Sequence, residues 1–339
     1  MTNSIQYLST KVKSVLYIIL YFPNIVYFLY VYLKYLKNPS VSNFPRIRSV
    51  AFRSGGKSLD VARALGVMKY KKSSVKFFAA GGLLNLCEQD FVNSRKSMHD
   101  FGFWIAPNPI EASKLESFRT AAIENLYLAK DVPADPSEIE DIAALWEQDM
   151  VNLETQWVVD QSLTLELATS PDVVRIATEY IGASPVLNYP ESWFSFPVAK
   201  IRKESAKNWH WDCDGIRWLK VFVYLNDVTL DNGPHAYVAG SHRHWKVNDK
   251  GTRVTEEQIV NSYGEKAIRS FTAPRGTVIF EDTRGFHRGT PLVSGHRLVL
   301  QLQFNLDGFA LGKSRITIPS QYIERSNKFP RMLDFLKNS

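Results

Sequence analysis

Apolar positions along the chain change their spacing from one region to the next. Residues 14–33, SVLYIILYFPNIVYFLYVYL, contain no charged residue and reach the length of about 20 residues that a bilayer-crossing helix needs. Apolar positions then recur at helical spacing, and from about residue 186 they alternate with polar ones as in strands. The pattern predicts an apolar helical segment, a helical region and a final antiparallel β region.

The helical region is punctuated by recognisable helix boundaries. Short helices are expected in 58–72 and 81–94, and 99–126 is typical of a strand followed by an amphipathic helix. The clearest boundaries belong to a helix in 170–182. There Ser170 is expected to cap the N-terminus, Pro171 takes the first helical position and Gly182 follows the last turn.

The β region has stretches of alternating apolar and polar residues between turns rich in Gly, Pro, Asn and Asp. The predicted strands are 218–225, 235–240, 276–282 and 297–304. Strands that follow helices in this way are typical of an α+β fold with a mainly β core. We expect a double-stranded β-helix, a cupin-like jelly roll, with helices packed on one of its sheets.

Charge is distributed unevenly along the chain. Residues 1–77 hold 13 Lys and Arg but one acid, Asp60, whereas the remainder has 28 basic and 33 acidic residues. A basic arm beside an apolar run favours a membrane surface over nucleic acid. The predicted organisation is a membrane-associated segment over 1–37, a basic helical connector over 38–95 and a jelly-roll domain over 96–339.

The positive residues that follow the apolar run place the large domain in the cytoplasm by the positive-inside rule. Pro23 interrupts the run, so the segment either spans the bilayer or lies on it. The two cysteines, Cys87 and Cys213, are too few for a disulfide framework, which favours a reducing compartment. Each is expected to act as a small buried apolar residue.

The stretch NWHWDCDG, residues 208–215, contains a candidate pair of metal ligands. In a strand, side chains two positions apart share one face about 6.6 Å apart, so His210 and Asp212 can converge on one ion. That spacing is weak evidence alone. His287, after another predicted strand, supplies a third ligand, and two histidines with one carboxylate form the facial triad of non-haem Fe(II) oxygenases.

Strand periodicity suggests which residues surround this triad. A turn and a returning strand can bring Arg297 beside His287, and its guanidinium suits a carboxylate. Gln301 and Gln303 share the face of Arg297, which is expected to line a cavity. Another strand places a second set on one face, and that face either lines the same pocket or faces solvent. Its members are Trp218, Lys220, Phe222 and Tyr224.

Other patterns compete with this interpretation. His242 and His244 form a second spaced pair but have no third ligand nearby, so they are interpreted as loop residues. Residues 51–58, AFRSGGKS, fit a permissive P-loop pattern, yet the alternating βαβ units of such a fold are missing. A basic turn is the preferred interpretation there. His99 and His296 have no metal partner in sequence, and Trp209 and Trp211 are assigned to packing.

Four segments together resemble the phytanoyl-CoA dioxygenase family of Fe(II)- and 2-oxoglutarate-dependent oxygenases. They are FGFWIAPNPIEASKLESFR, WHWD, LKVFVYLNDVTLDNGPHAYVAGSHR and GTVIFEDTRGFHRGTPLVSGHR, and the resemblance covers roughly residues 96–306. Two positions depart from the family pattern. Ala239 stands where proline is common, and His235 stands where an aliphatic residue is more usual.

The resemblance assigns roles to individual residues. It implies that His210, Asp212 and His287 hold catalytic iron and that Arg297 pairs with the far carboxylate of 2-oxoglutarate. It also suggests further cosubstrate contacts from Phe222, Thr290 and Ser294. Because Asp212 is present, the resemblance implies oxygen insertion, since halogenating relatives replace that carboxylate with a small residue.

The expected activity follows from that resemblance. Fe(II), 2-oxoglutarate and O2 are the implied cofactor and cosubstrates, and succinate and CO2 the by-products. We expect hydroxylation of an aliphatic carbon in a lipid-like or other small organic substrate, with a lipid favoured if the membrane segment is real. The alternatives are a non-catalytic jelly-roll protein that binds metal or ligand and, more remotely, a nucleotide-binding protein. No nucleic-acid partner is expected.

Overall fold

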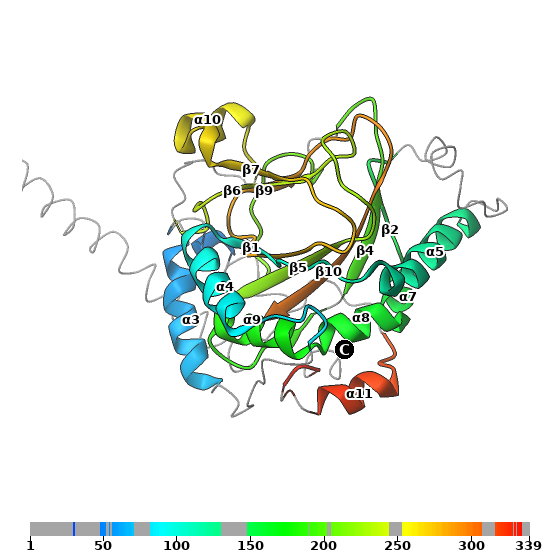
Figure 1. Ribbon diagram of the computed structural model, residues 1–339. Helices are drawn as coiled ribbons and strands as arrows, with labels where there is room; N and C mark the ends of the chain where they lie inside the picture. Colours follow the sequence, from blue (N-terminus) through cyan, green and yellow to red (C-terminus); the bar gives the residue numbers. More distant parts are fainter. Residues whose placement is uncertain are drawn as a thin grey trace, which may run out of the picture.

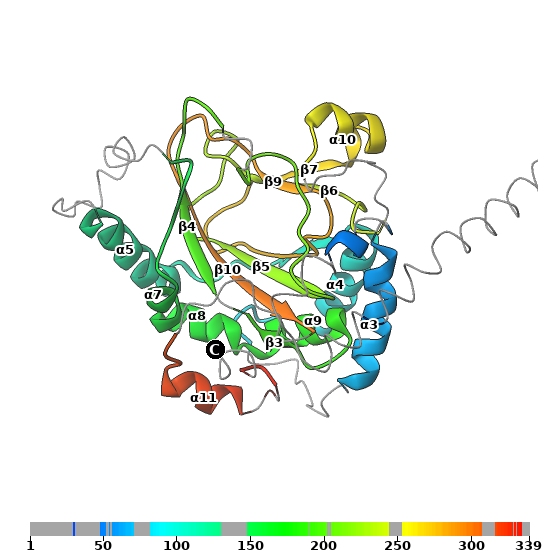
Figure 2. The ribbon, with the colours of Figure 1, turned by 180° about the vertical axis from the view of Figure 1, so that it is seen from behind.

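Two antiparallel sheets face each other, and helices cover the outer side of the larger one (Figure 1). The computed structural model describes residues 30, 48–51, 54, 56–70, 82–129, 148–188, 190–201, 205–243, 253–306, 316–327, 329 and 331–333. Seen from behind in Figure 2, the same layers follow one another: helices, large sheet, small sheet. This arrangement confirms the predicted mixed fold with helices on one sheet.

Strand order identifies the architecture as a double-stranded β-helix. The larger sheet runs β1 (Phe103–Ile105), β8 (Val278–Glu281), β5 (Trp218–Tyr224), β10 (Arg297–Asn305), β4 (Glu191–Ser195) and β2 (Met150–Asn152), with β3 (Val186–Leu187) also on β10. The smaller sheet runs β7 (Ile268–Phe271), β6 (His235–Val238) and β9 (His287–Gly289). His210 bridges to His287, so the segment around His210 extends the smaller sheet beyond β9.

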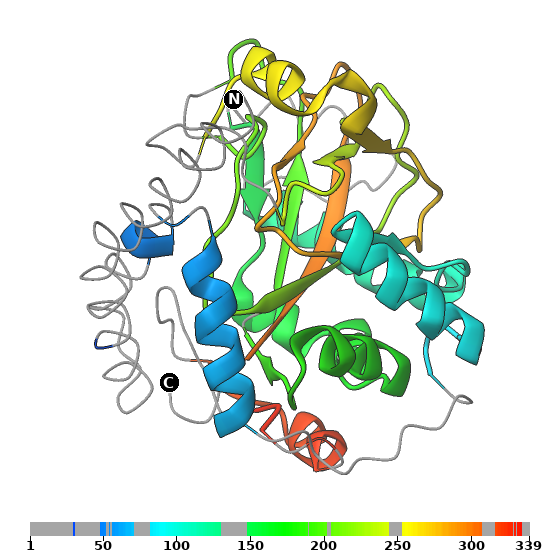
Figure 3. The same ribbon diagram turned by 90° about the vertical axis from the view of Figure 1, so that its left-hand side faces the viewer.

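The helices form a layer beneath the larger sheet. They are α4 (Glu88–Asp100), α5 (Ala112–Leu128), α7 (Thr155–Asp160), α8 (Ser162–Ala168) and α9 (Pro171–Ile181). Helix α9 contacts β5, α7 contacts β4, and α4 contacts β1 and α9. Three further helices lie around this core: α3 (Lys57–Lys69), α10 (Glu256–Tyr263) and α11 (Ser320–Ser326). Figure 3, like the other views, shows α10 and α11 at opposite ends of the molecule.

Helix α9 begins and ends at the predicted residues, but the predicted N-terminal cap is not formed. Pro171 opens it, and Gly182 ends it in the left-handed conformation with a φ of 91°, which only glycine adopts at little cost. Ser170 does not cap its own helix with its side chain. Its hydroxyl oxygen instead accepts a hydrogen bond from Leu83 N at 2.7 Å, and so attaches α9 to the segment before α4.

Apolar side chains fill two separate spaces. Between sheet and helices, residues from β10 such as Leu298, Leu300 and Leu302 pack in the main core. The opposite face of β10 points between the two sheets, where Val299 joins a smaller inner cluster. Its other buried members are Phe222, Tyr224, Val228, Tyr237, Phe271 and Ile279. The alternation along β10 therefore separates the helix-covered core from the interior of the barrel.

A buried carboxylate holds the loop between β8 and β9. Asp282 is fully buried and lies 3.3 Å from Arg217 Nη1 and 3.0 Å from Arg284 Nη2, measured from its Oδ2. The Tyr180 hydroxyl of α9 donates to the same oxygen, and Arg284 also reaches Asp60 of α3. Burial alone raises the pKa of Asp282, but the two guanidinium groups hold it well below its ordinary value. The loop is thereby tied to the helix layer.

The four predicted strands are all present, but several sequence-based expectations need correction. The boundary expected at residue 95/96 falls inside α4, whose Phe91 and Met98 are both buried. Cys87 is an exposed thiol, whereas Cys213 is buried as expected. Residues 48–51 are helical, so a P-loop reading lacks its preceding strand.

The apolar run 14–33 lies outside the described residues, apart from Tyr30. In the part of the chain that the structure describes, no helix is both long and apolar enough to cross a bilayer.

Replacement of Asp282 by Asn should destabilise the fold strongly. The change leaves two buried guanidinium groups facing a neutral amide, and breaking a buried ion pair costs about 3–5 kcal/mol. Chemical denaturation should show this loss in the free energy of unfolding. The exposed Asp231→Asn substitution is the control, and an equal, small effect of both variants would contradict the structural role of Asp282.

Candidate active site

Backbone pairing brings two distant segments together at the mouth of the barrel. His210 N donates to His287 O at 3.0 Å, and His287 N donates to His210 O at 2.8 Å. Asp212 N donates to Thr283 O at 2.8 Å, in the loop between β8 and β9. These bonds fix the position of the backbone that carries all three predicted ligands.

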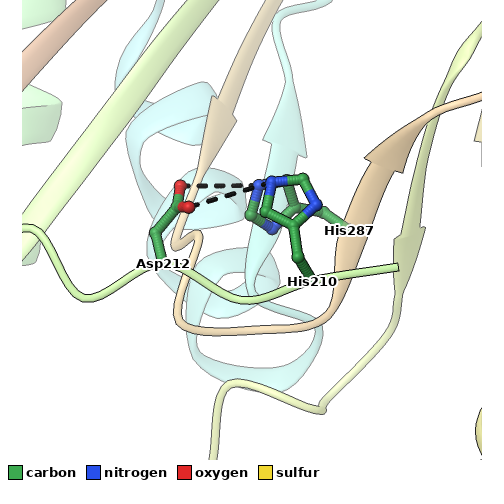
Figure 4. A group of neighbouring side chains, drawn as sticks. All are labelled: His210, Asp212 and His287. Carbon is green, nitrogen blue, oxygen red and sulfur yellow. Dashed lines mark ion pairs between the residues drawn. The ribbon is translucent and has the colours of Figure 1, made fainter. Parts of the chain in front are cut away.

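The side chains of His210, Asp212 and His287 converge on one point. The His210 Nε2 atom lies 3.8 Å from Asp212 Oδ1, and the His287 Nε2 atom lies 3.5 Å from Asp212 Oδ2. All three donor atoms lie within 4.8 Å of one another. Figure 4 shows the carboxylate on one side and the two imidazoles opposite, with their nitrogens directed at its oxygens. The arrangement can hold a single metal ion.

Hydrogen bonds on the far side of each imidazole prepare it for a metal. The Nδ1 atoms of His210 and His287 each lie 2.9 Å from a backbone carbonyl, that of Asn208 and of Gly285 respectively. A carbonyl only accepts, so Nδ1 carries a proton in both rings and Nε2 is the atom that faces the cluster. Burial, aided by His287, lowers the pKa of His210 to about 3, which keeps its imidazole neutral.

Asp212 is ionised by its neighbours. Burial opposes ionisation, but the Lys220 ammonium and His287 hold the pKa of Asp212 well below its ordinary value. The Lys220 Nζ atom lies 2.7 Å from Asp212 Oδ2 and 3.0 Å from Asp214 Oδ2. These two carboxylates outweigh the burial of Lys220 and raise its pKa. Lys220 is therefore a neutralised cation that orients the Asp212 carboxylate.

The cluster opens into a cavity of about 660 Å³ between the two sheets. Arg297, at the start of β10, lines the same cavity and is only 4% exposed. Its Nη1 donates to Gly233 O, and its Nε is buried with no hydrogen-bond partner. A Cβ at Gly289 would lie 2.5 Å from Arg297 Nη2, so glycine at this position makes room for the guanidinium. The cavity thus contains the three candidate metal ligands and the buried guanidinium of Arg297.

The predicted pocket residues divide into two groups. Lys220, Phe222 and Gln301 line the cavity. Trp218 and Tyr224 do not, although they share a strand with Lys220 and Phe222. Trp218 Nε1 donates to Thr283 Oγ1, and the Tyr224 hydroxyl donates to Phe271 O, so both side chains satisfy their polar atoms within the packed interior.

The two hydroxyl residues proposed as cosubstrate contacts also lie outside the cavity lining. Ser294 is exposed in the turn before β10, where its backbone N lies 3.2 Å from Asp231 O. Thr290 follows β9, and its backbone N donates to Pro234 O. A turn residue's type says nothing of which way the turn faces, which explains both discrepancies.

Sequence reasoning missed several polar residues of the cavity, among them Glu191, Lys207 and His235. Lys207 and Glu191 line it without belonging to any motif, and His235 lines it from β6. His235 Nε2 lies 2.7 Å from Glu281 Oε2, and burial, despite this partner, lowers the pKa of His235. The only available signal was that His235 departs from the family pattern. Glu191 and Lys207 precede recognisable elements and could not be assigned to a face.

Several histidines and tryptophans of the described chain make contacts outside the three-residue cluster. His242 Nε2 lies 3.2 Å from His99 O, and His296 packs near Phe194. His244 lies outside the described residues. Trp209 and Trp211 are buried, and Trp209 Nε1 donates to Glu256 at 2.9 Å.

A double-stranded β-helix with two histidines and one carboxylate at its mouth defines a non-haem metal-site protein of the jelly-roll class. Residues 98–298, more than half of the chain, match the family model described as phytanoyl-CoA dioxygenase (PhyH). The chain belongs to the phytanoyl-CoA dioxygenase family and is a 2-oxoglutarate-dependent dioxygenase that uses Fe(II) and O2. No curated protein sequence matches the chain.

Several solved structures share part of the fold. The carbocyclase SnoK, described as a non-heme alpha ketoglutarate dependent enzyme of nogalamycin biosynthesis, is 16% identical over 66% of this chain and 85% of its own, with a TM-score of 0.46. EctD from S. alaskensis is 17% identical over 67% and 82%, with a TM-score of 0.46. HygX from Streptomyces hygroscopicus is 15% identical over 65% and 87%, with a TM-score of 0.42.

Replacement of Asp212 by Ala should abolish metal binding, because it removes the only oxygen ligand of the cluster. The affinity for Fe(II) or Mn(II) under anaerobic conditions should fall further than it does when a hydrogen-bond partner of a metal ligand is removed, a loss of about 10- to 100-fold. Calorimetric titration measures this effect. Asp214→Ala is the matched control, since it removes the second carboxylate of Lys220 but no ligand, and equal losses in both variants would contradict the assignment.

Proposed function

We propose that the chain hydroxylates an aliphatic carbon of a small polar organic molecule, with His210, Asp212 and His287 holding Fe(II) and Arg297 holding 2-oxoglutarate. The observation that carries this proposal is that one cavity contains both the three candidate metal ligands and a buried guanidinium whose Nε has no hydrogen-bond partner in the described chain. Bound Fe(II) and 2-oxoglutarate supply the oxidising chemistry, with succinate and CO2 as by-products. The protein contributes binding, orientation and exclusion of water.

The donor set supports iron at the cluster. Two imidazole nitrogens and one carboxylate oxygen are borderline-hard ligands that would supply three positions of an octahedral ion and leave three open. The Nδ1 hydrogen bonds to Asn208 and Gly285 hold both rings in the tautomer that a metal requires. Lys220 keeps the Asp212 carboxylate ionised and oriented before any ion arrives.

Arg297 is suited to the far carboxylate of the cosubstrate. A buried guanidinium costs free energy unless it finds an anion. Its Nε lacks a partner among the described residues, so a dicarboxylate that reaches from the metal cluster to Arg297 would supply the missing acceptor. Phe222 lines the cavity and offers an apolar face beside the carbon chain of such a ligand.

The cavity lining favours a polar substrate over a lipid-like one. Its apolar side chains are Met150, Trp193, Ala206 and Phe222; apart from Gly289, all other lining residues are polar or charged. Gln301 Nε2 donates to Glu191 Oε2 at 2.9 Å, which leaves the other Glu191 oxygen available to a ligand. A hydrocarbon chain packed here would leave polar groups without hydrogen bonds, at a cost of about 1–3 kcal/mol each.

Wild-type protein supplied with Fe(II) and 2-oxoglutarate under anaerobic conditions should bind both, and admission of air should yield succinate. Arg297→Ala should weaken 2-oxoglutarate binding by about 10- to 100-fold, because it removes a charge-assisted hydrogen bond, while leaving metal affinity unchanged. Ser294→Ala, in an exposed turn, is the control and should behave as wild type. Binding of both ligands without any succinate would favour the non-catalytic alternative.

We further propose that residues 14–33 attach the enzyme to a membrane, with the catalytic domain on the cytoplasmic side. The support is sequence alone: a 20-residue uncharged run followed by a basic stretch. The positive residues after the run would face anionic headgroups. A polar substrate pocket is compatible with this placement, because attachment and substrate recognition use different residues.

Deletion of residues 1–37 should move the protein from the membrane fraction to the soluble fraction, because the apolar run is removed. Ultracentrifugation of cell extracts measures the distribution, and succinate formation shows that the truncated protein still folds. Replacing Lys34 and Lys37 by Gln tests the contribution of charge separately. Equal sedimentation of full-length and truncated protein would refute membrane attachment by this segment.

A further inference from the structure

Two buried cations line the same end of the cavity. Lys207 is 5% exposed and Arg297 is 4% exposed, and both line the cavity that contains the metal cluster. Only Arg297 belongs to a family motif. Lys207 lies three residues before His210 in an irregular segment, so its side chain needs a separate explanation.

Backbone contacts bring the segment of Lys207 toward Arg297. Gly289 N donates to Ala206 O at 3.1 Å, which sets the segment before His210 beside the end of β9. The Arg297 guanidinium packs directly against Gly289.

From the other side, Arg297 is the register partner of Ser195 on β4. The carbonyl of the next residue, Phe196, lies 3.4 Å from Lys207 Nζ. The segment of Lys207 and the side chain of Arg297 therefore both lie beside Gly289 and beside the end of β4. Arg297 begins β10, whereas Lys220 pairs with Gln303 near the other end of that strand.

Neither cation forms an ion pair with a carboxylate of the described chain. The 3.4 Å contact to Phe196 O is a long hydrogen bond and the one contact of the Lys207 ammonium in the described chain, while Arg297 contacts Gly233 O and keeps an unpaired Nε. Burial and the nearby Arg297 guanidinium lower the pKa of Lys207 to about 7, partly offset by Asp149. Two buried positive groups that repel each other favour an anion between them.

Lys220 provides a contrast within the same cavity. It is also buried, but its ammonium contacts both Asp212 and Asp214 within 3.0 Å. Lys220 needs no further anion, whereas Lys207 does. The difference separates a cation that orients a metal ligand from one whose donors remain available to a bound molecule.

We propose that Lys207 is a second cosubstrate-binding cation, which together with Arg297 encloses the distal carboxylate of 2-oxoglutarate. This assignment rests on the proposed function, because it requires the cosubstrate to extend from the metal cluster toward Arg297. A carboxylate has two oxygens and about four acceptor positions, so it can accept from both a guanidinium and an ammonium. The pair would then select 2-oxo acids with a second carboxylate.

The test is anaerobic calorimetric titration of full-length protein, loaded with Mn(II), with 2-oxoglutarate. Lys207→Met should raise the Kd for 2-oxoglutarate by about tenfold or more, because a charge-assisted hydrogen bond is lost. Lys207→Arg should stay within a few-fold of wild type. Lys266→Met, an exposed lysine outside the cavity lining, is the matched charge control and should leave the Kd unchanged.

A second ligand distinguishes direct contact from a structural role. 2-Oxopentanoate has the same carbon chain length and the same metal-binding end but no distal carboxylate, so Lys207→Met should not weaken its binding further. Equal losses for both ligands, or no loss for either, would overturn the proposal. Lys207→Gln is titrated in parallel and replaces the Met variant if that protein does not fold.

If the proposed function itself is wrong, the titrations give a different result. Wild-type protein would then bind Mn(II) without 2-oxoglutarate, and Arg297→Ala would have no effect on 2-oxoglutarate binding. If instead Arg297→Ala weakens 2-oxoglutarate and Lys207→Met does not, the function stands and only the role of Lys207 is refuted.

Discussion

The antiparallel pairing between the segment at His210 and the loop that enters β9 is the constraint on which the site depends. Two reciprocal backbone hydrogen bonds join His210 and His287, residues that are far apart in the chain. Backbone bonds of this kind fix both segments to within a fraction of an ångström, and side chains at matched positions then meet without further adjustment. Asp212 is held next to them by a separate backbone hydrogen bond to Thr283 O in the same loop.

The loop that carries this pairing is itself anchored by charge. Asp282, at its start, joins two arginines and the Tyr180 hydroxyl in a region without solvent. Through Arg284 the network reaches Asp60 on α3, an element remote from the barrel mouth. A buried ionic network is a weak source of net stability, but it penalises alternative arrangements because each would leave a charge unpaired. The catalytic loop is therefore specified by the helix layer behind the sheet.

Within the cavity, the charges separate into paired and unpaired groups. At one end, Lys220 is neutralised by two carboxylates and orients Asp212 of the three-residue cluster. At the other end, Arg297 and Lys207 have no carboxylate partner in the described chain. These two positive groups gain an opposite charge only when an anion binds in the cavity. The family fold supplies the framework, and residues such as Lys207 and His235 adapt it in this chain.

Local patterns in the sequence were sufficient for the elements themselves. The four alternating stretches became β5, β6, β8 and β10, and Pro171 and Gly182 bound α9 as predicted, because backbone preference and side-chain periodicity act over neighbouring residues. The strands β2, β3 and β9, of two or three residues each, carried too few residues to show a period. The resemblance named the metal ligands together, and the structure brings their donor atoms to one point.

Tertiary structure alone decided the functions of individual buried polar groups. Periodicity placed Trp218, Lys220, Phe222 and Tyr224 on one face, but only Lys220 and Phe222 reach the cavity, because Trp218 packs in the main core and Tyr224 in the inner cluster. Sequence could not distinguish Lys207 from Lys220, since the difference lies in which carboxylates the fold brings near each. The sequence by itself determined the four alternating strands, the boundaries of α9 and the ligand types. Their partners were decided by contacts between residues remote in the chain, whose register no local preference encodes.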